Sequence, residues 1–232
     1  MIGILGGMGT QAGLDFCNKL AKLNKGKLDQ QYPMFVLYNK SNTPKRPENL
    51  KKYYNVLKAL VQGCKMLEKN KCKFIVMPCN TAHYWQEDIQ KKIKIPLISM
   101  PKEVYKNTKK TCKKNSKIGI LCTEATLKTK VYSKYFDKDF NLISPAKLLQ
   151  KNSVNKSIKF VKMGKIKEAE KAIRPAVKYL IKNKCKKIIL GCTELPIAIF
   201  AYKSFKKIKK SKIFIDPNLL LAEISLKKYK NL

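Results

Sequence analysis

Two segments of the chain repeat one pattern that ends in a cysteine. Residues 71–81 (KCKFIVMPCNT) align without a gap with residues 184–194 (KCKKIILGCTE), at an offset of 113 residues. Upstream of them, residues 2–6 (IGILG) match residues 118–122 (IGILC), at an offset of 116 residues. In the first pair, a lysine-flanked apolar run of strand character ends at a cysteine, and the polar residues that follow can begin a helix. The repeat predicts two copies of one βα arrangement, each with a thiol at the carboxyl end of a strand.

These two thiols belong to Cys79 and Cys192. If the two copies face each other, the thiols meet across a cleft, which suits removing a proton from one face of a carbon atom and delivering one to the other. Each cysteine precedes an expected helix start, where free backbone N–H groups and the helix dipole stabilise a thiolate. Either cysteine alone would be interpreted as a core thiol. Their matched placement in both copies favours a joint role as acid and base.

Short β-rich runs alternate with segments of helical periodicity, which predicts a parallel α/β architecture. Apolar stripes of helical spacing cover residues 48–69 and 167–182, and Pro175 predicts a kink or a helix boundary in the second stripe. Residues 39–47 contain two prolines and predict a long loop of the kind that often belongs to a site. The expected strands are residues 2–6, 34–38, 73–78, 96–99, 117–121, 140–143, 186–191 and 212–215.

The chain of 232 residues is long enough to bury a substantial core, and the repeat divides it into two domains. We expect an N-terminal α/β domain of residues 1–100 and 213–232, which carries Cys79. We expect a C-terminal α/β domain of residues 101–212, which carries Cys192. This division returns the last helix to the first domain, because residues 212–231 resemble the end of the first copy.

The formal net charge is +36, and nearly all of the positive charge is lysine. The lysines are spread over the whole length, whereas nucleic-acid-binding proteins usually concentrate their basic residues on one face. The pattern therefore indicates a compositional bias, and a positive field that attracts small anionic substrates. A lysine-rich protein that binds nucleic acid without catalysis is the alternative from another class.

The eight cysteines form no C-x-x-C pair and the chain has one histidine, so no metal site is predicted. The chain starts directly in a strand without a basic leader, and it contains no apolar run of membrane length. We therefore expect a cytoplasmic protein without membrane contact. In a reducing cytosol, the remaining thiols are predicted to be small apolar core residues: Cys17, Cys64, Cys72, Cys112, Cys122 and Cys185.

The glycine-rich opening, residues 3–12, contains Gly7-x-Gly9-x-x-Ala12, which partly fits a dinucleotide-binding fingerprint. That interpretation needs an acidic residue at the end of the second strand, where this chain has Asn39. The opening instead predicts backbone amides at a helix start that can approach a carboxylate. No cofactor is expected.

Three motifs resemble the aspartate racemase branch of the cofactor-independent aspartate/glutamate racemase family: residues 6–9 (GGMG), 78–83 (PCNTAH) and 191–194 (GCTE). They occur in the family's order and the resemblance spans almost the whole chain. Glutamate racemases open with an Asp-Ser-Gly element and have a histidine where this chain has Glu194. The resemblance implies two pseudosymmetric Rossmann-like domains, each with a mainly parallel sheet flanked by helices. It also implies catalysis without pyridoxal phosphate, and a homodimer.

The resemblance further implies roles for individual residues. Cys79 and Cys192 become the two acid/base thiols, Arg46 the arginine for a substrate carboxylate, and Lys162 the lysine for the side-chain carboxylate. The family usually has proline and threonine where this chain has Thr10 and Gly13, so Thr10 would offer its amide or hydroxyl instead. The other implied substrate contacts are Met8, Asn80, Thr81, Thr123, Thr126, Thr193 and Glu194.

The expected reaction inverts the α-carbon of a small dicarboxylic amino acid, aspartate or also glutamate. One thiolate removes the α-proton while the opposite thiol delivers a proton, and amides and hydroxyls stabilise the enolate-like carbanion. Broader racemisation, decarboxylation of a malonate and maleate isomerisation are alternatives on the same scaffold, although the pair of thiols argues against a one-thiol decarboxylase. His83, four residues after Cys79, is expected to cap or pack rather than to abstract protons.

Overall fold

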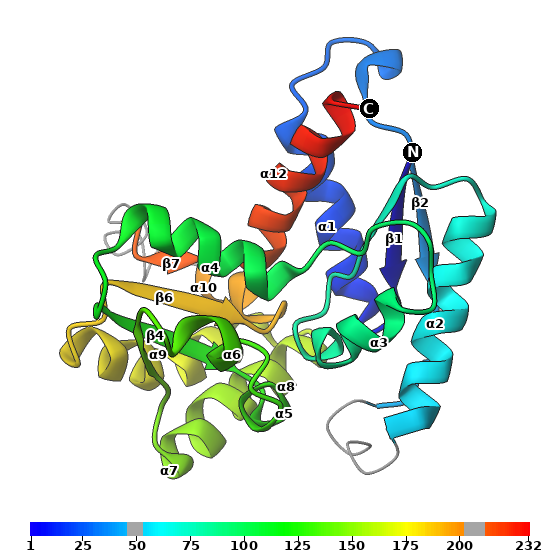
Figure 1. The fold of residues 1–232 in the computed structure, drawn as a ribbon. Helices are drawn as coiled ribbons and strands as arrows, with labels where there is room; N and C mark the ends of the chain where they lie inside the picture. The colour runs from blue at the N-terminus through cyan, green and yellow to red at the C-terminus, as the bar shows by residue number, and fades with distance from the viewer. Residues whose placement is uncertain (46–52, 202–211) are drawn as a thin grey trace. The chain divides into compact units, whose positions relative to one another are not determined.

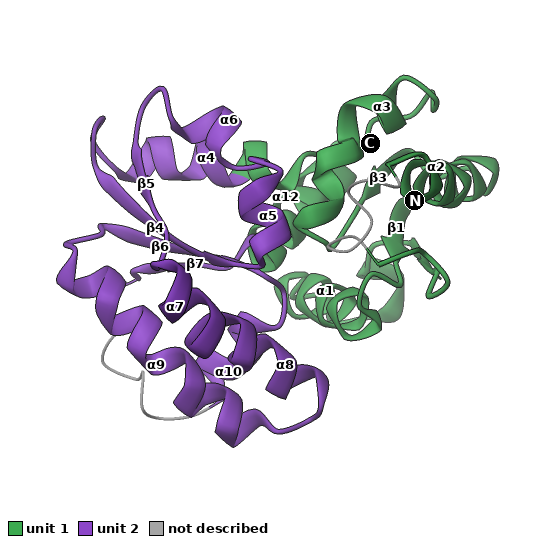
Figure 2. Ribbon diagram, turned by 90° about the horizontal axis from the view of Figure 1, so that it is seen from below, with its two compact units in different colours: residues 1–103, 218–232 green, residues 104–217 purple. Residues whose placement is uncertain are grey.

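The computed structural model describes residues 1–45, 53–201 and 212–232. The described chain divides into two compact units (Figure 2). The first comprises Met1–Glu103 and Asn218–Leu232, and the second comprises Val104–Pro217. Each unit is built on one parallel sheet with helices on its faces, which confirms the predicted α/β fold class.

In the first unit, the sheet has the strand order β2-β1-β3, with β1 (Ile2–Gly6) in the centre. Strand β2 spans Phe35–Asn39 and β3 spans Phe74–Val76, and both pair with β1 in parallel. The helical elements of this unit are α1 (Thr10–Leu23), η1 (Asp29–Gln31), α2 (Tyr53–Lys69), η2 (Thr81–Trp85), α3 (Gln86–Gln90), the start of α4 (Met100–Thr111) and nearly all of α12 (Pro217–Lys230).

Alternating side chains of the first sheet enter two separate apolar clusters, as expected for a sheet covered on both faces. Leu5 and Ile75 pack with residues of α2, such as Leu60. Ile4 and Val76 pack with residues of α1 and α12. Helices α1 and α12 lie side by side (Figure 1), where the Asn218 side chain donates to the carbonyl of Ala12.

In the second unit, the parallel sheet has the order β5-β4-β6-β7. Its strands are β4 (Lys117–Cys122), β5 (Asn141–Ile143), β6 (Lys187–Gly191) and β7 (Phe214–Ile215). In Figure 2, α4 and α6 lie on one side of this sheet and α9 and α10 on the other. The helical elements are α5 (Glu124–Lys128), α6 (Ser133–Phe136), α7 (Lys147–Leu149), a π-helix η3 (Gln150–Asn155), α8 (Lys156–Lys162), α9 (Ile166–Lys182) and α10 (Leu195–Phe200).

The internal repeat is visible in the register of the two sheets. Gly3 pairs with Ile75 in the first sheet, and the equivalent Gly119 pairs with Ile188 in the second. The turns that lead into β3 and β6 also match. Lys71 (φ 59°) and Lys184 (φ 60°) both adopt a left-handed conformation directly after a helix. In each turn the next N–H group bonds back to a helix carbonyl, which is a Schellman-type helix end.

Several boundaries differ from the sequence-based expectations. The expected strand at residues 96–99 is wrong, because the structure has only a single bridge between Ile75 and Leu97 there. Pro175 does not end a helix: α9 continues through it. Residues 213–217 were placed with the first domain, but β7 pairs with β6 and therefore belongs to the second unit. The expected helix 48–69 is observed from Tyr53 onward, and its first residues lie outside the described ones.

Candidate active site

In the first unit, Cys79 lies just beyond the carboxyl end of β3, in the turn that leads to η2. Its N–H donates to the carbonyl of Met77 at 2.7 Å, and the residue is 8 % exposed. Asn80 and Thr81, the next two residues, are also buried. Within the described part of the chain, the Cys79 sulfur makes no hydrogen bond. The Cys79 thiol is therefore buried in the apolar cluster that also contains Met77 and Ala82.

The glycine-rich opening forms the turn between β1 and α1. Gly7 has φ +86°, and a Cβ atom there would lie 2.2 Å from the carbonyl carbon of Lys40, so only glycine fits this close approach. Thr10 is the exposed first residue of α1, where its amide is one of the helix's free donors. The side chain of Met8 lies in the apolar core with Leu5, which leaves its backbone as the part that could contact a substrate.

Arg46 and His83 are the remaining candidates of the first unit. Arg46 lies outside the described residues, so the structure says nothing of its position. The His83 ring is buried, and its Nδ1 lies 2.9 Å from the carbonyl oxygen of Cys79. The ring therefore contacts the backbone of the cysteine residue.

In the second unit, Cys192 directly follows β6, and its thiol has a carboxylate partner. The Cys192 thiol donates to Oε2 of Glu194 at 3.0 Å, and the Thr193 hydroxyl donates to the same oxygen at 3.2 Å. The other carboxylate oxygen, Oε1, lies 3.6 Å from Nζ of Lys162, at the end of α8. The lysine side chain is 61 % exposed and that of Glu194 is 13 % exposed. Four predicted site residues thus form one cluster.

This cluster favours the protonated thiol of Cys192. Burial raises the pKa of Cys192 well above its ordinary value, and the charge and hydrogen bond of Glu194 raise it further. Lys162 acts in the opposite direction but does not reverse the effect. The N–H of Glu194, at the N-cap position of α10, lowers the pKa of Cys192 as expected for a helix start, but burial and the Glu194 carboxylate outweigh this effect. In this arrangement Cys192 is set up as a proton donor.

Thr123 and Thr126 lie at the carboxyl end of β4, in the same unit. The Thr123 side chain caps α5 by accepting from the N–H of Thr126 at 3.2 Å, and the two hydroxyl oxygens are 3.0 Å apart. The predicted Thr-x-x-Thr pair is therefore one hydrogen-bonded unit. Its first role is to fix the turn after β4.

The sequence analysis missed Gln150, which supports the same turn from the π-helix η3. Its buried side-chain amide donates to the carbonyl of Cys122 at 2.8 Å and to Asn155, which in turn donates to Glu124. π-Helical turns are rare and are often found at functional sites. A single polar residue inside a helical pattern gave no signal that could have identified it.

All eight cysteines lie in the described residues and are free thiols. Cys72, Cys122 and Cys185 are buried as predicted, and burial raises the pKa of Cys64 to about 12, so this thiol is protonated at neutral pH. Cys17 and Cys112 are only half-buried, in contrast to the prediction that they are core residues.

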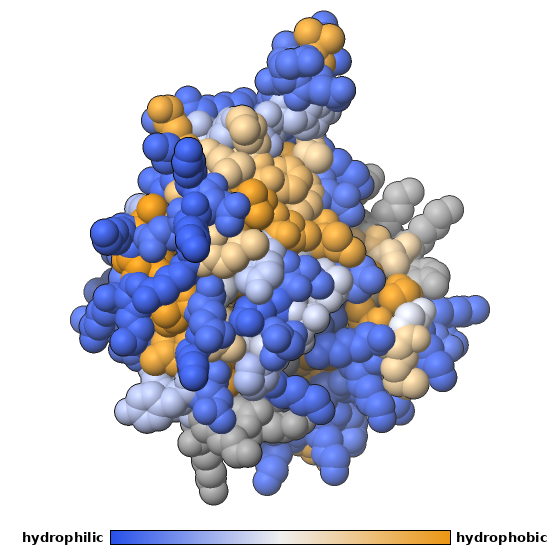
Figure 3. All heavy atoms as spheres, turned by 90° about the vertical axis from the view of Figure 1, so that its right-hand side faces the viewer, coloured by the Kyte–Doolittle hydropathy of each residue, from blue (hydrophilic) through white to orange (hydrophobic). Residues whose placement is uncertain are grey.

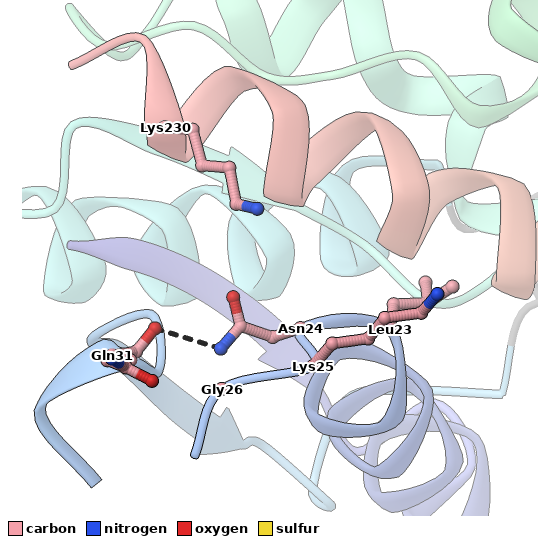
Figure 4. A pocket seen from close by; sticks show the side chains of 6 residues that line it. All are labelled: Leu23, Asn24, Lys25, Gly26, Gln31 and Lys230. Carbon is pink, nitrogen blue, oxygen red and sulfur yellow. Dashed lines mark hydrogen bonds between the residues drawn. The ribbon is translucent and has the colours of Figure 1, made fainter. Parts of the chain in front are cut away.

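A pocket of about 300 Å³ in the first unit lies away from these residues (Figure 4). In the close-up, the Asn24 amide points to the Gln31 backbone, to which it donates at 2.8 Å. The pocket contains no candidate site residue. It is lined by Leu23, Asn24, Lys25, Gly26, Gln31 and Lys230.

Figure 3 shows hydrophilic residues over much of one molecular face, with hydrophobic residues in a band across its upper middle and in smaller groups at its left and right. The exposed apolar residues of the first unit include Leu28, Met34 and Phe35 on and before β2. Among the described helices, none is both long and apolar enough to cross a membrane.

The fold and the site define a two-unit parallel α/β protein with one buried thiol just beyond the carboxyl end of the equivalent strand in each unit, β3 and β6. The chain belongs to the Asp/Glu/Hydantoin racemase family, whose profile matches residues 5–224. This confirms the predicted family, which is one of isomerases.

Similar proteins include an aspartate racemase of Picrophilus torridus, a solved structure with 30% sequence identity and a TM-score of 0.84, which covers 99% of this chain and 94% of that one. The broad-specificity amino-acid racemase RacX of Bacillus subtilis (strain 168) is 33% identical over 138 residues, 58% of this chain and 59% of RacX. A glutamate racemase of Persephonella marina is 25% identical over 74% of this chain and 65% of its own length. The alignments therefore span less than two thirds of these curated relatives.

Proposed function

We propose that this protein is a cofactor-independent amino-acid racemase that interconverts L- and D-aspartate. The observation that carries the proposal is the equivalent position of Cys79 and Cys192. Each follows the carboxyl end of a strand, and the two strands pair in equivalent registers with the central strand β1 and with β4. The 30% identity with an aspartate racemase over nearly the whole chain favours aspartate. A homodimer, which the family resemblance implies, and the cytoplasmic location expected from the sequence remain part of the proposal.

The two thiols would carry out the proton transfers. In one direction, the Cys79 thiolate removes the α-proton of the substrate and becomes a thiol. Cys192, held as a thiol by Glu194, delivers its proton to the opposite face of the α-carbon and becomes a thiolate. The reverse direction exchanges the two roles. Hydroxyl and amide groups of Asn80, Thr81, Thr123 and Thr193 would stabilise the carbanion as an enolate-like species at the α-carboxylate.

Charged side chains would fix the two carboxylates of aspartate. Lys162 is mostly exposed, so its ammonium group can exchange Glu194 for the side-chain carboxylate of the substrate. Arg46 is proposed for the other carboxylate, because a guanidinium group can bind it in a bidentate manner. Together they would set which carbon lies between the two sulfur atoms.

Other substrates are the second candidate. RacX is named a broad-specificity amino-acid racemase and the Persephonella marina protein a glutamate racemase, so glutamate or several amino acids are alternatives to aspartate. Lys162 favours acidic substrates, because its exposed ammonium group can exchange Glu194 for a carboxylate of the substrate.

The test is incubation of the purified protein with L-aspartate in D₂O without added cofactor. Deuterium incorporation at the α-carbon, together with the appearance of D-aspartate, is the expected result. A protein that leaves the α-hydrogen of aspartate, glutamate and neutral amino acids in place contradicts the proposal. Salt-sensitive retention on DNA in the absence of exchange would support nucleic-acid binding instead.

A further inference from the structure

His83 is the only histidine of the chain, and both of its ring nitrogens contact the backbone of the first unit. The residue is 1 % exposed. Nδ1 lies 2.9 Å from the carbonyl oxygen of Cys79, and Nε2 lies 3.1 Å from the backbone nitrogen of Met100, the first residue of α4. The ring thus bridges the turn of the candidate catalytic thiol and the start of a helix.

These contacts determine which nitrogen carries the proton. A backbone N–H can only donate, so Nε2 must accept from Met100, whereas the Cys79 carbonyl can only accept, so Nδ1 must donate. The carbonyl of Ile98 is farther from Nε2, at 3.4 Å. A proton on Nε2 would face the N–H of Met100. The neutral ring with its proton on Nδ1 is the form that satisfies both short contacts.

The His83 ring is a side-chain link between the Cys79 turn and α4. Cys79 lies outside the strand pairing of β3, and its own N–H bonds to a carbonyl only two residues before it. A buried imidazole costs free energy unless its nitrogens are hydrogen-bonded, and an apolar side chain would avoid that cost. The two hydrogen bonds therefore indicate that the ring has a role besides filling space in the core.

We propose that His83 is a positioning residue for Cys79: by tying the Cys79 carbonyl to the first turn of α4, it sets the direction in which the thiol points. The chain continues along α4 from the first unit into the second, so the ring connects the thiol to the helix that leaves its unit. The catalytic meaning of this contact rests on the proposed function, but the contact itself can be tested without turnover.

The first test uses the wild-type protein. Because the chain has one histidine, its ring nitrogens are assigned without ambiguity in ¹⁵N NMR spectra. We expect the neutral tautomer with the proton on Nδ1, because this form satisfies both short contacts. A proton on Nε2 overturns the proposal.

The second test separates the two bonds by substitution. In His83→Asn the short amide can still donate to the Cys79 carbonyl, whereas in His83→Gln the longer one can reach only the position of Nε2. Ser99→Ala is the matched control: it removes the contact between the Ser99 hydroxyl and the N–H of Lys102, in the first turn of α4, without touching Cys79.

The readout is the alkylation rate of Cys79 relative to that of Cys192 in the same molecule, measured by peptide mass spectrometry. We expect His83→Gln and His83→Asn both to raise this ratio about tenfold or more, because each variant keeps only one end of the link and the freed turn exposes the thiol. Ser99→Ala should leave the ratio near the wild-type value. An unchanged ratio in either folded His83 variant overturns the proposal, and so does an equal rise in Ser99→Ala.

Activity provides a separate readout. Loss of α-hydrogen exchange for one enantiomer only, the one served by Cys79, is expected in His83→Gln, since a small misplacement of a reacting group can cost about 100-fold in rate. The wild-type protein and all variants could fail to exchange the α-hydrogen although the alkylation ratio rises as expected. That result would show that the proposed reaction is wrong and would still support the positioning role of His83.

Discussion

At the scale of single residues, the two thiols differ although their positions in the repeat match. Cys192 donates to a carboxylate, whereas the structure gives the Cys79 sulfur no such partner among the described residues. A negative neighbour stabilises the protonated form of a thiol, so Glu194 opposes the thiolate that a base requires. The asymmetry indicates that Cys192 is protonated in the resting protein.

Glu194→Gln tests this asymmetry. The substitution removes the negative charge and keeps an amide of similar shape, so the pKa of Cys192 should fall from its raised value. The thiolate would then form at lower pH, and the pH at which iodoacetamide alkylates Cys192 at half its maximal rate should move to lower pH. The Cys79 rate, measured in the same digest, is the internal control. A Cys192 profile that stays unchanged or moves to higher pH would show that Glu194 does not hold the proton on the thiol.

Lys162→Met tests the second charge of the cluster. The side chain is mostly exposed, so the free energy of unfolding should change by less than about 1 kcal/mol. The use of aspartate, relative to amino acids without a second carboxylate, should decrease by about 10- to 100-fold, because a charge-assisted hydrogen bond is lost. Lys159→Met, an exposed position on the same helix α8, is the matched control. Equal aspartate kinetics in both variants would remove Lys162 from the site.

At the scale of elements, α9 shows how a helix accommodates a proline in its interior. The Ser153 hydroxyl, on the π-helix η3, donates to the carbonyl of Ala172 at 2.5 Å and accepts from the N–H of Ala176 at 3.3 Å. These two groups, four residues apart, would pair with each other in a regular helix. Ser153 thus satisfies the backbone beside Pro175, where a proline disturbs the helix. The helical periodicity of residues 167–182 does not reveal that Ser153, in another helical element, bonds to this backbone.

Ser153→Ala should therefore lower the free energy of unfolding by about 1–3 kcal/mol, because it leaves buried backbone groups without their partner. Chemical denaturation followed by circular dichroism measures the change. Ser157→Ala is a useful comparison, since the Ser157 hydroxyl only donates to the carbonyl of Ala169, and a smaller loss is expected. In a Pro175→Ala background the helix can close on itself, so the cost of Ser153→Ala should shrink. A cost that is the same in both backgrounds would contradict the coupling.

The strands were predicted where apolar runs are bounded by polar residues, and the central strands of both sheets lie where the repeat placed them. The failure at residues 96–99 has a physical cause, because a short apolar run does not reveal how many of its residues will pair. The repeat also identified Cys79 and Cys192. It could not reveal the partner of each, since the contacts of Glu194 and His83 depend on side-chain directions that only the folded turns define.

At the scale of the whole molecule, duplication gives each unit one thiol just beyond the carboxyl end of the equivalent strand. A single unit offers one base to one face of a carbon atom, and racemisation needs a second group for the other face. The proposed function therefore requires both units in every turnover, although hydrogen exchange at one face requires only one thiol.

This difference separates the roles of Cys79 and Cys192. Cys79→Ser and Cys192→Ser should both abolish racemisation, because a serine hydroxyl is not ionised near neutral pH and cannot replace the thiolate. Each variant keeps one base, which can remove the α-proton of one enantiomer and return solvent deuterium to the same face. Each should therefore exchange the α-hydrogen of one enantiomer of aspartate, and the two variants should prefer opposite enantiomers. Chiral chromatography with mass detection of deuterium measures both quantities.

Cys72→Ala and Cys185→Ala provide the controls, since these two thiols also occupy equivalent positions in the repeat but precede β3 and β6, at the opposite ends of these strands from Cys79 and Cys192. Both should retain racemisation and exchange of both enantiomers, provided that the protein remains folded. Full racemase activity in either serine variant would show that the two-thiol mechanism is wrong. Equal exchange of both enantiomers by one serine variant would point to a single base that reaches both faces, and the division of labour between the two units would then have to be abandoned.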